Sequence, residues 1–101
     1  MLPAEQALIL AAILFVTGVI GVIVRRNLIF VLMSVEIMFN AAGLAFVAGS
    51  ALHGQPDGQI FFIFILPVAA AEVAIGLALA VLVFQKYRTL DLWTIARSRE
   101  E

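Results

Sequence analysis

The sequence lacks cysteine and has few charged residues, and both features exclude classes of protein. Without cysteine, the 101 residues form no disulfide, no thiolate-held iron–sulfur cluster and no cysteine nucleophile. His53 is the only histidine, so the chain offers a poor set of ligands for a metal site. Charged residues make up 13% of the chain and hydrophobic residues 64%, too little polar surface to cover a small soluble domain. The net charge of −1 gives no reason to expect nucleic acid as a partner.

Most of the chain consists of three long apolar runs. We predict an all-α membrane protein with three transmembrane helices at about residues 5–24, 28–50 and 60–84, because each run is long enough to cross a bilayer. A tail at 85–101 follows, and residues 1–101 form one domain. The first run is not a cleavable signal peptide, since no basic residue precedes it and Arg25-Arg26 follow it.

The basic residues are distributed on one side only. The N-terminus and the second loop, residues 52–59, contain no lysine or arginine. The six basic residues lie in the first connection and in the tail: Arg25, Arg26, Lys86, Arg88, Arg97 and Arg99. Three spans place these two segments on the same side of the membrane, which the positive-inside rule makes the cytoplasmic side. We therefore predict an external N-terminus and a cytoplasmic C-terminus.

Two glutamates interrupt the apolar runs. Glu36 lies in the second run, whose eleven Leu, Ile, Phe and Val residues between positions 28 and 47 favour insertion by roughly 5 kcal/mol, against a cost of about 3 kcal/mol for the carboxylate. Glu72 is the only polar residue of the third run. An ionisable residue at this depth points to function, and two nearby carboxyls resist ionising together. Glu36 and Glu72 are therefore predicted to transfer protons.

The neighbours of the glutamates indicate a protein environment. Asn40 lies one helical turn from Glu36 and is predicted to support it through a hydrogen bond, directly or through water. Small residues around Glu72, such as Ala69 and Gly76, allow another helix to approach closely. Three helices cannot shelter two carboxyls alone, so we predict partner subunits. A plainer interpretation is that each glutamate only anchors a neighbouring helix by hydrogen bonding.

Other residues have more modest expected roles. Arg25 and Arg26 are topology determinants that can also support the site by contacting lipid headgroups or a carboxylate of a partner. Gly18 and Gly21 make a smooth patch for helix packing. Pro67 is predicted to kink the third span because it removes a backbone hydrogen bond.

Several motifs resemble a known family. Residues 25–29 (RRNLI), 36–38 (EIM) and 40–41 (NA) resemble the second-helix motif of the K subunit of proton-pumping NADH–quinone oxidoreductase, respiratory complex I. Residues 69–78 (AAAEVAIGLA) resemble its third-helix motif. Together with length and layout, the resemblance covers nearly the whole chain, although the first helix and the tail match only in character.

The resemblance implies a role that composition alone does not show. It implies a subunit of a proton-translocating NADH:quinone oxidoreductase, with Glu36 as the more critical proton carrier and Glu72 as its relay partner. The expected partners are the J, A and antiporter-like N subunits together with membrane lipid. No cofactor is expected in this chain, since other subunits bind NADH, FMN, the iron–sulfur clusters and quinone. The expected location is the bacterial inner (plasma) membrane or an equivalent energy-transducing membrane.

Three alternative functions remain at this stage. The C subunit of multisubunit cation/proton antiporters is related, but usually lacks both helix glutamates. A non-catalytic scaffold subunit would use the glutamates to hold helices together. A small drug/proton exporter acting as a dimer would usually line its glutamate with aromatic residues, whereas alanines surround Glu72.

Overall fold

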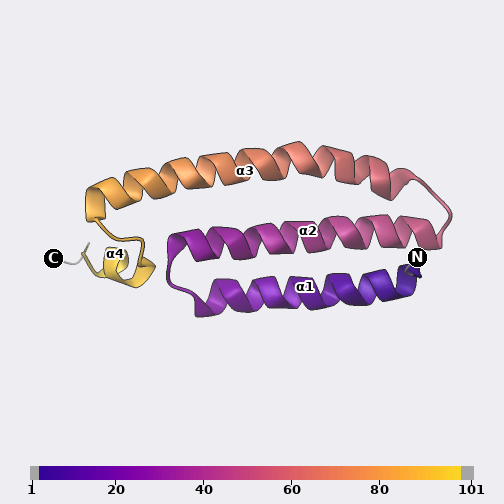
Figure 1. Ribbon diagram of the computed structural model, residues 1–101, viewed down its shortest axis with the longest axis horizontal. Helices are drawn as coiled ribbons and strands as arrows, with labels where there is room; N and C mark the ends of the chain where they lie inside the picture. Colours follow the sequence, from indigo (N-terminus) through magenta and orange to yellow (C-terminus); the bar gives the residue numbers. More distant parts are fainter. Residues whose placement is uncertain (1–2, 99–101) are drawn as a thin grey trace.

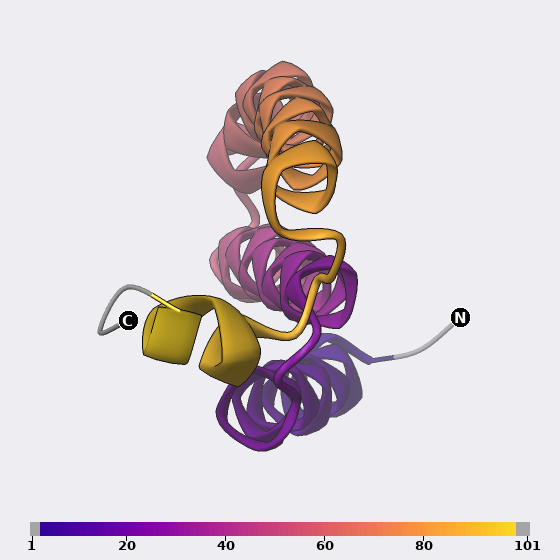
Figure 2. The same ribbon diagram turned by 90° about the vertical axis from the view of Figure 1, so that its left-hand side faces the viewer.

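The computed structural model describes residues 3–98, which form four helices. Three are long, α1 (Ala4–Val24), α2 (Leu28–Leu52) and α3 (Asp57–Tyr87), and one is short, α4 (Leu92–Ser98). The long helices run antiparallel, with α2 between α1 and α3 (Figure 1). Viewed along their length they form one flat layer rather than a closed bundle (Figure 2). All three are long and apolar enough to cross a membrane, which confirms the predicted all-α, three-span class.

Glycines allow α1 and α2 to pack closely. A Cβ atom at Gly18 would lie 2.8 Å from the Ser34 carbonyl oxygen, and one at Gly21 would collide with the Ser34 hydroxyl. The Ser34 side chain is buried in this contact. The predicted packing patch at Gly18 and Gly21 is thus confirmed, and close backbone approach supplies the van der Waals contact that holds membrane helices together.

The contact between α2 and α3 also uses small residues. A Cβ atom at Gly76 would lie 2.8 Å from Leu32, and one at Gly43 would lie 2.5 Å from the ring of Phe62. Nearer the α2–α3 turn, the rings of Phe46 and Phe61 lie 4.7 Å apart. The buried hydrophobic residues are all alanines: Ala11, Ala41, Ala48, Ala69 and Ala80. The chain therefore has a thin interior and leaves its large side chains on the outside.

The outer faces of the layer are broadly apolar. Ile23 is 77% exposed, Phe64 69% and Ile63 64%, and exposed large hydrophobic side chains occur on all three long helices. Apolar surface on this scale requires lipid or other protein against it. Helix α3 continues through Pro67 and is bowed, with its convex side away from α2 (Figure 1).

One end of the layer is closed by a short backbone pairing. The N–H of Leu28 donates to the carbonyl of Leu90 (2.9 Å), and the N–H of Leu92 donates to the carbonyl of Arg26 (2.7 Å). Asn27 and Asp91 form an antiparallel bridge between these bonds. We call residues 26–28 and 90–92 the clasp. It joins the α1–α2 connection to the linker between α3 and α4.

The opposite end is closed by a serine. The Ser50 hydroxyl accepts a hydrogen bond from the N–H of Gly58 (2.9 Å) and donates one to the carbonyl of Gln55. Gly54 has φ 64°, a left-handed conformation that favours glycine, and it lets the chain reverse between α2 and α3. The α2–α3 pair is therefore tied at both ends.

Candidate functional site

The packing of α2 against α3 sets Glu36 and Glu72 at the same level. Gly76 lies against Leu32. The two helices are antiparallel, so one turn forward along α2 from Leu32 and one turn back along α3 from Gly76 reach the same height. Those steps end at Glu36 and Glu72. The structure therefore brings the two predicted proton-transfer residues to matching positions on neighbouring helices.

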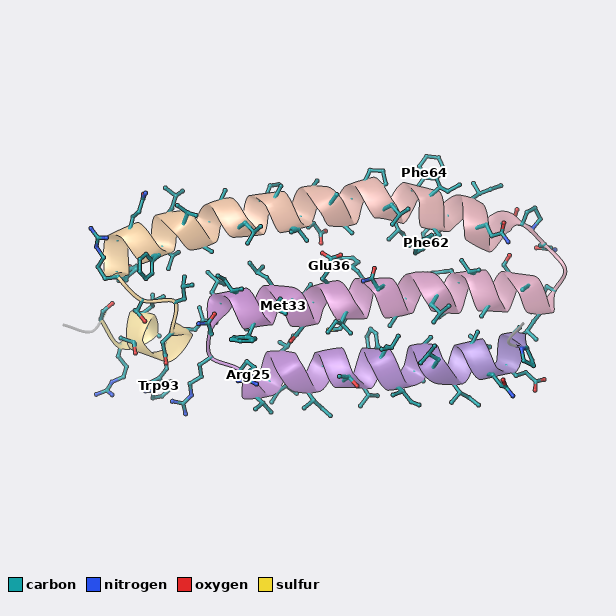
Figure 3. The ribbon with its side chains drawn as sticks, in the orientation of Figure 1. Arg25, Met33, Glu36, Phe62, Phe64 and Trp93 are labelled. Carbon is teal, nitrogen blue, oxygen red and sulfur yellow. The ribbon has the colours of Figure 1, made fainter. Side chains whose placement is uncertain are left out.

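Glu36 occupies the α2–α3 contact. Its side chain is half-buried and points from α2 toward α3 (Figure 3). Counted around the helix, Glu36 lies within about 40° of Leu32 and about 20° of Gly43, the residues that contact α3. The carboxyl group is thus held on the face that α2 turns toward α3.

Glu72 lies at the edge of the corresponding face of α3. Ala69 and Gly76, one turn away on either side, are buried, whereas Glu72 itself is exposed. The single chain therefore does not bury this glutamate. A carboxyl group exposed at the middle of an apolar helix is costly in lipid, so this position calls for a polar neighbour from another chain.

Asn40 lies on the same side of α2 as Glu36. It is exposed, and the hydrogen bonds found within residues 3–98 include none between Asn40 and Glu36. Asn40 borders a cavity of about 560 Å³ between α2 and α3, whose other walls include Gln59 and Phe62. Apart from Asn40 and Gln59 its lining is apolar, so this space lies beside Asn40 without forming a polar site.

The two arginines are placed at the clasp, away from the glutamates. Arg25 and Arg26 are exposed, and Figure 3 shows Arg25 well separated from Glu36 along the layer. The Arg25 guanidinium lies 4.8 Å from the centroid of the Phe30 ring, and that of Arg26 lies 5.8 Å from the centroid of the Trp93 ring. Both are cation–π distances, which orient the arginines at the rim of the layer.

The remaining ionisable residues do not form a metal site. Within residues 3–98, no group of three or more His, Cys, Asp or Glu side chains is placed to hold a metal ion. His53 lies at the α2–α3 turn, with Nδ1 2.9 Å from the Gly49 carbonyl oxygen.

Two features that position the site were missing from the sequence interpretation. The Leu32–Gly76 contact sets the level of the glutamates, and the clasp ties the end of α3 to the start of α2. The clasp had a weak signal in two helix-capping residues. Asn27 accepts from the N–H of Ile29 (2.9 Å), and Asp91 accepts from the N–H of Thr94 (3.0 Å).

Comparison with known proteins decides the family. Residues 6–100 match the family described as NADH-ubiquinone/plastoquinone oxidoreductase chain 4L. The chain belongs to this family.

Bacterial members of the chain 4L family are similar over nearly their full length. A protein from Nitrosospira multiformis is 57% identical over 98 residues, which cover 97% of this chain and 96% of that protein. One from Acidiphilium cryptum is 57% identical over 89 residues, or 88% and 87% of the two chains. One from Pseudomonas aeruginosa is 52% identical over 91 residues, or 90% and 89%. Each is named NADH-quinone oxidoreductase subunit K.

Membership of the chain 4L family confirms the resemblance of the two glutamate-containing motifs. The chain is a subunit of NADH-quinone oxidoreductase, and its three apolar helices make it an integral protein of the bacterial inner membrane. The matched family is the one that residues 25–41 and 69–78 resemble.

Proposed function

We propose that Glu36 and Glu72 transfer protons within the membrane arm of a proton-translocating NADH–quinone oxidoreductase. The observation that carries this proposal is their register: two carboxyl groups stand level on adjacent antiparallel helices that are mostly apolar. Ionisable residues inside membrane spans mark proton or ion pathways, and two of them at matching depth on neighbouring helices are suited to pass a proton from one to the other.

The environments of the two glutamates favour different roles. Glu36 is half-buried on the inner face, with Asn40 one helical turn away on the same side of α2. Glu72 is exposed at the edge of α3 and turns toward whatever covers that helix. We infer that Glu36 is the main proton carrier, supported by Asn40. Glu72 then relays the proton between Glu36 and a neighbouring subunit.

The apolar outer faces fit assembly with other membrane subunits. We propose the J, A and antiporter-like N subunits as partners and lipid on the remaining surface, which accords with the exposed side chains of Ile23 and Phe64. NADH, FMN, the iron–sulfur clusters and quinone are then bound by other subunits. Arg25 and Arg26 would contact lipid headgroups or acidic groups of a partner at the clasp end.

Native electrophoresis tests this assignment. A C-terminally tagged chain, in membranes solubilised with mild detergent, is expected to migrate in a very large complex that stains for NADH oxidation in the gel. An antiporter assembly would migrate as a smaller band without that stain, and an exporter would migrate as a dimer. A tagged chain that stays apart from the NADH-oxidising band would contradict the assignment.

The orientation is a second proposal with its own test. The α1–α2 connection, the end of α3 and α4 lie at the same end of the layer and carry the basic residues Arg25, Arg26, Arg88 and Arg97 (Figure 1). We expect this end to be cytoplasmic and the Gly54 turn to be external. A reporter fused after the last residue should therefore read as cytoplasmic, and one inserted at Gly54 as external. The opposite readings would reject this orientation.

A further inference from the structure

The hydrogen-bond donors of the clasp are N–H groups that helix formation leaves free. Leu28 is the first residue of α2 and Leu92 is the first residue of α4. The first N–H groups of a helix have no acceptor within it. These two instead donate to the carbonyls of Leu90 and Arg26, at 2.9 and 2.7 Å. The clasp therefore links the two helix starts without weakening either helix.

Helix α3 is restrained by its packing on one neighbouring helix and by ties at its two ends. It packs on α2 alone among the long helices, because α1 lies on the far side of α2 (Figure 2). Its contact face is made largely of small residues, with Ala69, Gly76 and Ala80 buried. Leu32 packs against Gly76 and the Phe62 ring packs against Gly43, so these contacts and the ties at the two ends together set the axial position of α3.

The linker between α3 and the clasp is short and is held by two hydrogen bonds. Arg88 ends α3 in a left-handed conformation (φ 59°), and its N–H donates to the Phe84 carbonyl at 2.7 Å. The Thr89 hydroxyl accepts from the N–H of Asp91 at 3.1 Å. Only Arg88 and Thr89 separate the end of α3 from the clasp. At the other end, Ser50 holds Gly58 at the start of α3.

We propose that the clasp is a positioning device, which holds α3 at the axial register that sets Glu72 level with Glu36. A shift of α3 by a single residue displaces Glu72 by about 1.5 Å along the axis and turns it by about 100°. The consequence for activity rests on the proposed proton-transfer function. The axial register of α3 does not depend on that function, so the register and the activity can be measured separately.

Proline substitution removes the clasp bonds selectively. Proline lacks the N–H donor but is well tolerated as the first residue of a helix. It also requires an extended residue before it, and Asn27 already has φ −79° and ψ 128°. The variant L28P/L92P therefore loses both clasp bonds and keeps the helix starts. The matched control L28A/L92A removes the same side chains and keeps both N–H groups.

A disulfide between α2 and α3 reports the register. The chain has no cysteine, so L32C/G76C introduces the only pair within it. Leu32 and Gly76 are in contact, and replacing leucine by cysteine opens space for the new side chain at position 76. Oxidation in native membranes, followed by mass spectrometry of the linked peptides, measures the yield of the 32–76 disulfide. Quinone-linked NADH oxidation is measured in parallel in cysteine-free versions of the same variants.

The expected results separate positioning from simple helix capping. The disulfide should form readily with the native clasp and with L28A/L92A, and its yield should fall severalfold in L28P/L92P, together with quinone-linked activity. An unchanged yield in L28P/L92P, or no disulfide with the native clasp, would overturn the positioning role. A lower yield with unchanged activity would support positioning and contradict the proposed proton transfer instead. If the double variant does not assemble, the single change L92P, which lies after all three spans and removes one of the two clasp bonds, should lower the yield relative to L92A, and an equal yield would overturn the positioning role.

Discussion

Replacing Glu36 by glutamine is expected to lower quinone-linked NADH oxidation and proton pumping together, each by about a hundredfold, the lower end of the range over which positioned acid–base groups act. Glutamine keeps the size of the side chain and its capacity for hydrogen bonding, but it carries no exchangeable acidic proton. The two rates fall together because electron transfer to quinone is coupled to proton movement. Both are measured in inverted membrane vesicles with a pH-sensitive dye.

Three controls make the Glu36→Gln result specific. NADH oxidation by an artificial acceptor that takes electrons at the flavin should persist, since the proposed function assigns the flavin to another subunit. The same substitution at Glu5, which is exposed in the first turn of α1, should leave both rates unchanged. Glu72→Gln should reduce them less than Glu36→Gln, because an exposed relay position is easier for water or a partner to replace. Normal pumping by a fully assembled Glu36→Gln complex would refute the proton-carrier role.

The sequence was sufficient to predict the helices because lipid simplifies the problem. A chain in lipid must satisfy its backbone hydrogen bonds internally, so a sufficiently long apolar run forms a helix. The runs around Glu36 and Glu72 therefore predicted α2 and α3. Gly18 and Gly21 also predicted a packing patch, because glycine has no side chain to hold a neighbouring helix away.

The arrangement of the helices was less accessible to prediction. Many Leu, Ile and Val positions are chemically alike, so composition does not tell which of them contacts Gly76. The Leu32–Gly76 contact, and with it the level of the two glutamates, follows only from the packed structure. The clasp is built from backbone N–H and carbonyl groups, which every residue except proline offers. The order of the layer, with α2 in the middle, likewise depends on packing that residue types do not encode (Figure 1).

Full burial of the two glutamates requires surfaces from other subunits. Sequence reasoning expected both carboxyls to be covered by protein, and the single chain leaves Glu36 half-buried and Glu72 exposed. The flat layer explains this result, because three helices in a row leave two broad faces open (Figure 2). Further burial of Glu72 requires a surface from another subunit.

Relocation of the carboxylate along α2 tests the central claim most directly. Asn40 is offset from Glu36 by about 40° around the helix and about 6 Å along it. It borders the cavity between α2 and α3, so a carboxylate at position 40 has space on the same side. Val35 is turned about 100° from Glu36, off the face that contacts α3. The matched pair is therefore E36Q/N40E and E36Q/V35E.

The measurement is proton pumping per NADH oxidised in the assembled complex, for both double variants and for E36Q alone. If Glu36 carries protons from the face that α2 turns toward α3, E36Q/N40E recovers a substantial part of the activity that E36Q loses. E36Q/V35E then stays at the level of E36Q. Equal recovery from positions 35 and 40, or no loss in E36Q itself, would contradict a proton carrier defined by its position opposite Glu72.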